Sequence, residues 1–261
     1  MTAARGDLIA IEGVTKRYLT TSGPVEALRD VSLAVGESEF CTLIGPSGCG
    51  KSTLLGMLGG LVMPDAGRLL IDGEPIKGPD PRRVATVFQD PGLFPWRTAL
   101  ENVELGLELQ GVAAARRRRV AEELLGPLGL AGFAGKYPRE LSGGMKQRVA
   151  IGRALAIDAK ILLMDEPFGA LDALTREKMN AELQRIWLAS RKTVVLITHS
   201  IDEAVFLGDR VIVMSARPGR IIRELEVNLP RPRIAAETFG HPEHIRIARE
   251  IRMLLEGGDA P

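Results

Sequence analysis

Residues 45–53 have the residue types and spacing of a loop that binds phosphate groups. They fit the pattern G-x-x-x-x-G-K-[ST] and are Gly45, Pro46, Ser47, Gly48, Cys49, Gly50, Lys51, Ser52 and Thr53. Glycines free the backbone to turn sharply, which lets its N–H groups approach an anion. In this pattern Lys51 can reach the terminal phosphates of a nucleotide, and the Ser52 hydroxyl can bind Mg²⁺.

The segments on either side of this loop have the character that such a loop needs. Residues 40–44 are apolar, as expected for a short buried strand, and the leucines and methionine of 54–58 favour a helix. A helix that follows the loop directs its positive end at the bound anion. The alternative is a glycine-rich turn that happens to contain a lysine, and it does not account for these flanks.

Three other apolar runs end in polar residues. Residues 161–164 are followed by Asp165 and Glu166, residues 84–88 by Gln89, and residues 193–197 by Thr198 and His199. Wholly apolar runs indicate a parallel sheet buried on both faces, and ligand groups of such sheets lie at the carboxyl ends of the strands. Two adjacent carboxylates there suit Mg²⁺ binding and the activation of water. Taken singly, the glutamine means little and the histidine is more often structural.

A second potential anion site lies about ninety residues after the phosphate loop, at Ser142, Gly143 and Gly144. Ser142 is expected to cap a helix over 142–157, and the two glycines leave N–H groups unobstructed at its positive end. The alternative is a plain helix cap with flexible glycines, and these residues alone do not decide between the two.

Two further residues are candidates on weaker grounds. Tyr18 precedes a predicted turn at 21–24 and could stack on a nucleotide base, although an ordinary strand tyrosine is the simpler interpretation. Asp172 is expected to cap a long helix that ends near Ser190. The residues expected on the inward face of that helix are Leu174, Met179, Leu183 and Ile186.

Composition restricts the class of protein. With 34 basic and 33 acidic residues among 261, the chain has no charge excess that would favour binding to nucleic acid. It has two cysteines and no Cys/His cluster, so neither a zinc site nor a disulfide framework is expected, and a reducing compartment fits. No apolar run is long enough to span a bilayer and residues 1–12 do not have the pattern of a signal peptide. Any connection to a membrane is therefore expected to go through a partner.

The order of expected elements predicts an α/β protein with a parallel sheet core. Residues 93–158 form three amphipathic helical stretches (98–109, 112–128 and 142–157) without a convincing strand, which indicates a helical insertion. Arg116 to Arg119 in the second stretch are interpreted as solvated surface rather than as a contact with lipid or a partner. A final strand pair is expected at 211–214 and 220–222, and a last helix at about 242–255.

The sequence resembles the ATP-binding subunit of ABC transporters over residues 8–227, in the phosphate loop, Gln89, the stretch from Leu141 to Gln147, Asp165-Glu166, Asp172 and His199. The stretch around Ser142 is the most specific part, since other phosphate-loop ATPases lack it. Residues 90–97, 174–177, 199–204 and 215–219 are similar to the nitrate, sulfonate and taurine importers of bacteria. The resemblance implies a phosphate-loop NTPase (RecA-like) fold with an antiparallel β subdomain beside the parallel core. It also implies a nucleotide-binding domain at 1–227 and a C-terminal extension at 228–261.

The resemblance also implies roles for the residues named above. Tyr18 would stack on adenine, and Gly45 to Thr53 would hold the phosphates of ATP. Gln89 and Asp165, with Ser52, would complete the Mg²⁺ site; Glu166 would be the general base, and His199 would contact the γ-phosphate. Ser142 to Gly144 would complete the site of a second copy of the chain, with Asp172 at the seam, so that two chains would sandwich two ATP molecules.

The implied partners are integral membrane permease subunits and, indirectly, an extracytoplasmic solute-binding protein, with no role for nucleic acid. The chain would lie on the cytoplasmic face of the inner membrane and energise import of nitrate, a sulfonate, taurine or a similar small solute. Residues 89–102, with the aromatic anchors Phe94 and Trp96, are expected to form a docking groove for a short permease helix, unless both rings pack into the insertion.

Two other classes compete with this interpretation. A soluble ABC ATPase of DNA repair or translation usually has long coiled coils, zinc cysteines or two ATPase domains, and this chain shows none of them. A phosphate-loop kinase or GTPase would not explain Ser142, Gly143 and Gly144.

Overall fold

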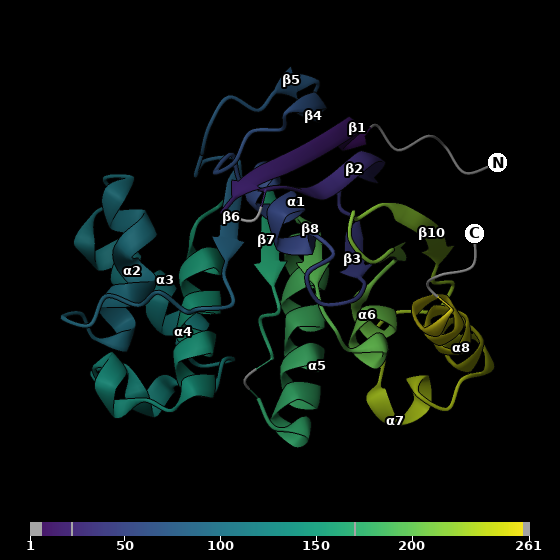
Figure 1. Cartoon of the computed structure of the whole chain (residues 1–261). Coiled ribbons are helices and arrows are strands. Elements are labelled where there is room, and N and C mark those ends of the chain that lie inside the picture. Colours follow the sequence, from purple (N-terminus) through teal and green to yellow (C-terminus); the bar gives the residue numbers. More distant parts are fainter. Residues whose placement is uncertain (1–6, 22, 170, 258–261) are drawn as a thin grey trace.

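The computed structural model describes residues 7–21, 23–169 and 171–257. They form two sheets whose strand orders are β2-β1-β4-β5 and β10-β9-β3-β8-β7-β6. The antiparallel sheet lies across one end of the larger sheet, with the helices α2, α3 and α4 on one side of the molecule and α7 and α8 on the other (Figure 1). This arrangement confirms the α/β class with an antiparallel subdomain and a helical insertion.

The centre of the larger sheet is parallel, as the wholly apolar runs predicted. Its strands are β3 (Phe40–Ile44), β8 (Thr193–Ile197), β7 (Ile161–Asp165) and β6 (Val84–Val87), extended by β9 (Arg210–Met214) and the antiparallel β10 (Ile221–Glu226). Successive side chains point to opposite faces. Phe40 therefore enters the core under the insertion, while Cys41 enters the core under the antiparallel sheet.

The antiparallel sheet is built on a long hairpin of β1 (Asp7–Thr20) and β2 (Gly23–Gly36). Both strands are longer than the apolar segments 8–11 and 31–35 from which they were predicted, and position 22 of the predicted turn lies outside the described residues. β4 (Ala66–Ile71) pairs with β1, and a two-residue turn at Asp72 and Gly73 leads into β5 (Glu74–Pro75). Positive φ angles of 55° and 74° at these two residues explain the Asp-Gly pair.

The helical insertion consists of α2 (Ala99–Leu109), α3 (Ala114–Leu125) and α4 (Gly143–Ala156), with short 3₁₀ turns at Ala131–Phe133 and Pro138–Glu140. Thr98 and Glu101 form a reciprocal cap at the start of α2. The second helix ends three residues before the predicted 128, and Gly129, at φ 67°, turns the chain there. Of the arginine run, Arg117 alone is half-buried, where it pairs with Glu104 at 3.0 Å.

The long helix α5 (Ala173–Ser190) shows one wrong prediction. Met179, Leu183 and Trp187 are buried, but Leu174 is 73% exposed and Ile186 is half-buried. At about 100° per residue, nine positions separate Leu174 from Leu183 by half a turn, so it projects from the opposite face. Asp172 caps α5 as predicted, since its carboxylate accepts from the Thr175 N–H at 2.9 Å.

The C-terminal segment adds α7 (Ala235–Thr238) and the predicted last helix, α8 (Pro242–Glu256), beside α6 (Ile201–Leu207), which was not predicted. Ile247 and Ile251 of α8 share a buried cluster with Ala204 and Val205 of α6. The extension expected at 228–261 is therefore packed against the element that follows His199, as far as residue 257; residues 258–261 lie outside the description.

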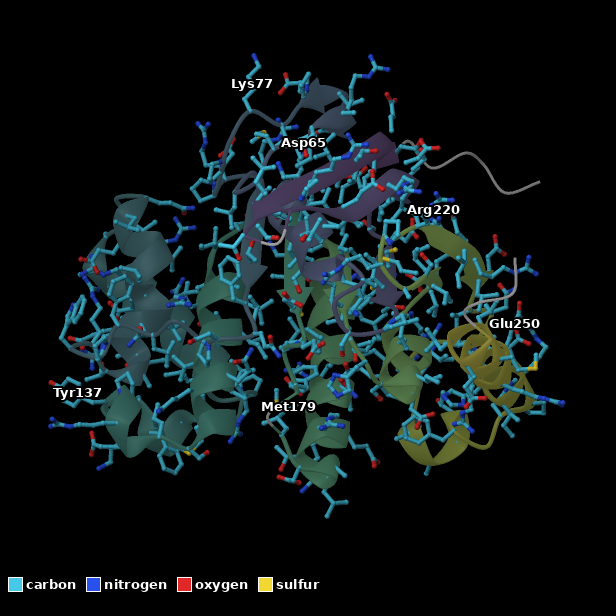
Figure 2. The ribbon with its side chains drawn as sticks, in the orientation of Figure 1. Asp65, Lys77, Tyr137, Met179, Arg220 and Glu250 are labelled. Atoms are coloured by element: carbon cyan, nitrogen blue, oxygen red, sulfur yellow. The ribbon has the colours of Figure 1, made fainter. Side chains whose placement is uncertain are left out.

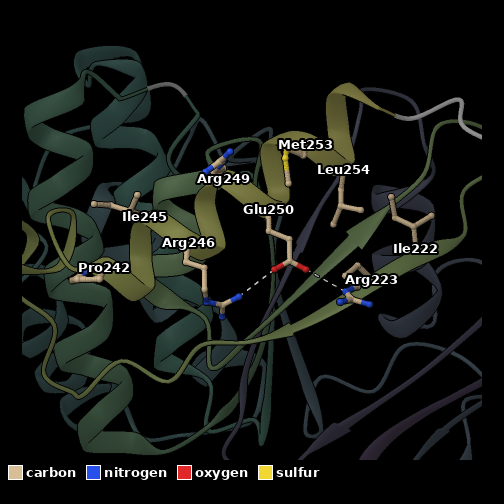
Figure 3. A pocket seen from close by; sticks show the side chains of 9 residues that line it. All are labelled: Ile222, Arg223, Pro242, Ile245, Arg246, Arg249, Glu250, Met253 and Leu254. Carbon is tan, nitrogen blue, oxygen red and sulfur yellow. Dashed lines mark hydrogen bonds and ion pairs between the residues drawn. The ribbon is translucent and has the colours of Figure 1, made fainter.

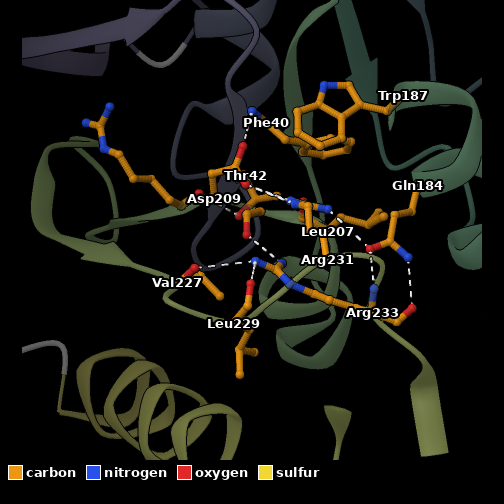
Figure 4. Close-up of polar contacts among 12 residues, drawn as sticks. Phe40, Thr42, Gln184, Trp187, Leu207, Asp209, Val227, Leu229, Arg231 and Arg233 are labelled. Carbon is orange, nitrogen blue, oxygen red and sulfur yellow. Dashed lines mark hydrogen bonds and ion pairs between the residues drawn. The ribbon is translucent and has the colours of Figure 1, made fainter. Parts of the chain in front are cut away.

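Arg233 attaches this segment through a buried guanidinium (Figure 4). It is 4% exposed and has no carboxylate among its hydrogen-bond partners in the described residues. Instead it donates to carbonyl oxygens at the end of α6 and after β10, namely those of Val205, Phe206, Gly208, Val227 and Leu229, at 2.7–3.4 Å. Burial lowers the pKa of Arg233 to about 9.

Nearby, Arg231 pairs with Asp209 at 2.9 Å and lies over the Trp187 ring.

Replacement of Arg233 by methionine should destabilise the protein by about 2–4 kcal/mol, because the carbonyls at the end of α6 would be buried without donors. Urea unfolding of the variant measures this as a lower midpoint. Arg252→Met on the exposed face of α8 is the matched control and should leave the midpoint within error. Equal midpoints for the two variants would contradict the assigned role of Arg233.

Candidate functional site

The phosphate loop joins the buried strand β3 to α1 (Lys51–Leu58), and the surrounding structure leaves no room for a side chain at two of its glycines. Gly50 has a φ of 100°, and a Cβ there would lie 2.6 Å from a Leu28 methyl. A Cβ on Gly45 would lie 2.9 Å from the Met214 carbonyl oxygen. The glycines therefore let β2, β9 and the loop approach closely, while the start of α1 presents free N–H groups to an anion.

Lys51 is 7% exposed and folds back onto its own loop. Its Nζ donates to the carbonyl oxygens of Gly45 at 2.8 Å and Pro46 at 3.1 Å, and lies 3.7 Å from the buried Cys49 Sγ. The ammonium is thus held inside the loop. The phosphate oxygens of a bound nucleotide would accept hydrogen bonds from the same ammonium N–H groups.

The carboxyl ends of three neighbouring strands bring together the polar residues that follow them. Glu166 comes after β7, Gln89 after β6 and His199 after β8. The Gln89 side-chain nitrogen donates to Glu166 Oε2 at 3.3 Å, and His199 Nδ1 lies 3.3 Å from the same oxygen. Glu166 has a φ of 45°, an uncommon conformation for a residue other than glycine, which marks a constrained position. A carboxylate held this way can accept a proton from water.

Asp165 lies deeper, beside the phosphate loop. Burial raises the pKa of its carboxyl, and the neighbouring Glu166 charge adds to the shift, while a hydrogen bond from Ser52 and the charge of Lys51 oppose it. The carboxylate of Asp165 and the hydroxyl of Ser52 therefore lie together as two oxygen groups at the base of the site.

Sequence reasoning missed a buried carboxyl group behind His199. Glu203, four residues later on α6, is 4% exposed, and burial raises the pKa of its carboxyl despite hydrogen bonds from Thr198 and Asn180. Arg176 lies near this carboxyl and donates to the carbonyl oxygens of Phe168 and Leu171. The loop before α5 is thus held by the half-buried Arg176, which lies near the buried Glu203 of the element that follows His199. The sequence signal that could have identified Glu203 is its position four residues after His199.

The expected second anion site lies at the start of α4. Ser142 caps the helix as predicted, and its Oγ accepts from the Met145 N–H at 3.3 Å. A Cβ on Gly144 would lie 2.4 Å from a Leu171 methyl, so this glycine allows close contact with the loop before α5. In the described residues no hydrogen bond joins Ser142 to the phosphate loop.

Two side chains of α4 hold the segment that contains Gln89. The Gln147 amide donates to the Phe88 carbonyl at 3.0 Å, and Arg153 donates to the carbonyls of Pro91 and Gly92 at 2.7 Å each. The helix that begins after Ser142 is therefore fixed directly to the residues around Gln89.

Tyr18 lies on β1, paired with Val25 and 39% exposed, with the Lys16 ammonium 5.6 Å from its ring centroid. Lys16 pairs in turn with Leu28, whose side chain lies against Gly50. The structure therefore places Tyr18 in the strand region that supports the phosphate loop.

A hollow of about 920 Å³ lies elsewhere, between β10 and α8 (Figure 3). Ile222, Ile245 and Met253 line it together with Arg246 and Arg249. It contains none of the residues expected to bind nucleotide. In the described part of the chain, no helix has the length and apolar character needed to cross a lipid bilayer.

The parallel core, the phosphate loop and the polar groups at the strand ends define a phosphate-loop nucleotide-binding protein. The chain belongs to the ABC transporter family, whose model matches residues 28–169. Proteins of this family bind ATP and hydrolyse it to drive transport.

Individual proteins similar to this chain agree with that assignment. It is 45% identical to the taurine import ATP-binding protein TauB of Pseudomonas entomophila, over 88% of each chain. It is 44% identical to the nitrate import ATP-binding protein NrtD of Synechocystis sp., over 95% of each chain. A solved dimeric structure of the ATP-binding cassette MJ0796 bound to ADP and Pi has a TM-score of 0.78 and 38% identity, covering 85% of this chain and all of that one.

Proposed function

We propose that this chain is the ATP-hydrolysing subunit of an importer for nitrate, taurine, another sulfonate or a similar small solute. The observation that carries the proposal is the convergence of Gln89, Glu166 and His199 beside a complete phosphate loop. Similarity to the taurine and nitrate import proteins over most of the chain supports the transport role and the solute class. A soluble ATPase of DNA repair or translation is not favoured by these similarities.

In the proposed reaction, the loop from Gly45 to Thr53 binds the phosphates of ATP and Glu166 takes a proton from the attacking water. The two contacts on one Glu166 oxygen support this role, because Gln89 and His199 hold the carboxylate in place. His199 is further assigned to the γ-phosphate, and Tyr18 to stacking on adenine.

Asp165, Ser52 and Gln89 are proposed to hold Mg²⁺. The donor set fits this ion, since one carboxylate, one hydroxyl and one amide oxygen are hard ligands and Mg²⁺ takes its remaining ligands from water and phosphates. Among the described residues no group of three His, Cys, Asp or Glu side chains forms an all-protein metal site. That finding fits an ion bound together with a nucleotide. Mg²⁺ would neutralise charge on the phosphates.

Two copies of the chain are proposed to sandwich two ATP molecules. The phosphate loop and the start of α4 are separate anion sites within one chain, and Ser142, Gly143 and Gly144 would complete the site of the second copy. Asp172 lies at the end of the loop that Gly144 contacts, which supports its assignment to the proposed seam. The dimeric MJ0796 structure supports the pairing of two copies.

Permease subunits are proposed to dock on residues 89–102. Trp96 is 69% exposed and meets the half-buried Phe94 edge to face at 5.2 Å between ring centroids. Asn102 holds the backbone beneath them through hydrogen bonds with Phe94 N–H and the carbonyls of Phe94 and Arg97. Arg153 of α4 donates a hydrogen bond to Gly92 in the same segment. A displacement of Trp96 by a docked permease would therefore be transmitted to Gln89 and to the Ser142 end of α4.

The remaining assignments follow from this role. The chain would lie at the cytoplasmic face of the inner membrane, held there by the permease, and an extracytoplasmic solute-binding protein would deliver the solute. Residues 1–227 would form the nucleotide-binding domain and 228–261 an extension.

Glu166→Gln should lower the ATP hydrolysis rate by about 10²–10⁴-fold while the chain still binds ATP, since the phosphate loop is untouched. The measurement is phosphate release at saturating MgATP together with nucleotide affinity. Glu177→Gln on the exposed side of α5 is the control and should hydrolyse ATP normally. Normal turnover by pure Glu166→Gln protein would refute the assignment.

Trp96→Ala should weaken permease docking by about 2 kcal/mol or more, roughly thirtyfold in affinity, while the ATP affinity of the isolated chain is unchanged. Copurification with the membrane subunits and solute uptake are the measurements. Phe133→Ala removes an exposed aromatic elsewhere on the insertion and should have no effect. If Trp96→Ala and Phe94→Ala chains both copurify normally and support uptake, the docking surface lies elsewhere.

A further inference from the structure

The loop between β9 and β10, residues 215–220, lies directly against the phosphate loop. Ser215 closes it on itself, because its Oγ accepts from the Arg220 N–H at 3.0 Å and donates to the Pro218 carbonyl at 3.2 Å. Gly219 exchanges backbone hydrogen bonds with β2, donating to Ala27 at 2.9 Å and accepting from Arg29 at 3.1 Å. The loop is thus a rigid element and not a loose connection.

Gly219 also explains how this loop comes so close to the nucleotide site. A Cβ at this position would lie 1.9 Å from the Cys49 carbonyl oxygen, so only glycine allows the contact. The backbone of the loop therefore rests on the backbone of the phosphate loop, between it and β2.

Arg217 extends from this rigid loop to the phosphate loop. Its Nε donates to the Gly48 carbonyl oxygen at 3.1 Å. A Cβ on Gly48 would lie 3.0 Å from Arg217 Nη2, so the guanidinium covers the position where Gly48 has no side chain. Arg217 is exposed, and no carboxylate in the part of the chain that the structure describes forms an ion pair with it.

The contact fixes the orientation of one peptide group. The peptide between Gly48 and Cys49 is planar, so a carbonyl bound to Arg217 directs the Cys49 N–H to the opposite side, into the loop. There the N–H donates to the Pro46 carbonyl at 3.3 Å. Gly48, at φ 75°, would otherwise leave this peptide free to rotate, because glycine has many accessible conformations.

We propose that Arg217 is a positioning residue for nucleotide phosphate, which holds the Gly48–Cys49 peptide so that the phosphate loop is ready to receive an anion. The inference rests on the ATP-binding role proposed above and is independent of the transported solute. In this role Arg217 acts through the backbone of the phosphate loop and does not contact the adenine base.

The test compares Arg217→Met with Arg220→Met by calorimetric titration with ATP and with inorganic tripolyphosphate. Arg220 belongs to the same loop and is exposed (Figure 2), and within the described ranges its side chain has no hydrogen-bond or ion-pair partner. Arg217→Met should weaken both ligands by the same factor, about five- to tenfold, since a loop that has lost its preorganisation must be ordered on binding. KM for ATP should rise by more than kcat falls, and Arg220→Met should bind as the wild type does.

Arg217→Lys separates the effect of the positive charge from that of the hydrogen-bond geometry, because lysine keeps the charge but lacks the planar guanidinium group. It should also bind both ligands more weakly than the wild type. Full affinity in Arg217→Lys, wild-type affinity in Arg217→Met, or a loss confined to ATP would each overturn the proposal. A wild-type chain that binds no ATP would overturn the proposed function as well, so the two failures are distinguishable. Thermal unfolding without nucleotide checks that the variants are folded.

Discussion

The close packing of backbone around the phosphate loop is the constraint on which the rest of the structure depends. An anion site made of N–H groups needs a loop that bends sharply and carries no side chain on its inner faces. Gly45 meets Met214 at the end of β9, and Gly50 meets Leu28 on β2. Strands of the antiparallel sheet and of the larger sheet therefore meet at this loop.

The acidic side of the site depends on the same sheet. Because β6, β7 and β8 are parallel neighbours, their carboxyl ends bring Gln89, Glu166 and His199 together from three distant parts of the sequence. The insertion is connected to this edge through Arg153, which holds the residues after Gln89. A subunit that docks on the insertion and a second copy that meets the start of α4 would thus act on one group of residues.

The elements that could be predicted from the sequence are those whose structure is determined by nearby residues. Apolar runs identified the buried strands, and Ser142 and Asp172 were correctly predicted as helix caps because capping is a local interaction. Leu174 was placed on the wrong face, since an apolar residue in the first turn of a helix need not follow the buried stripe. The buried Arg233 could not be predicted, because its partners are carbonyls on α6 and after β10 that only the folded chain brings together.

In the proposed dimer, ATP hydrolysis needs the phosphate loop of one chain and the Ser142 end of another. Mixing Lys51→Ala chains with Ser142→Arg chains tests this requirement, because a mixed dimer has one site without either change. Each variant alone should be inactive and should fail to dimerise with ATP, while the mixture should partly recover ATP-dependent dimerisation and hydrolysis. A mixture that recovers neither, or a Ser142→Arg chain that hydrolyses ATP normally alone, would show that the two sites do not cooperate across a dimer.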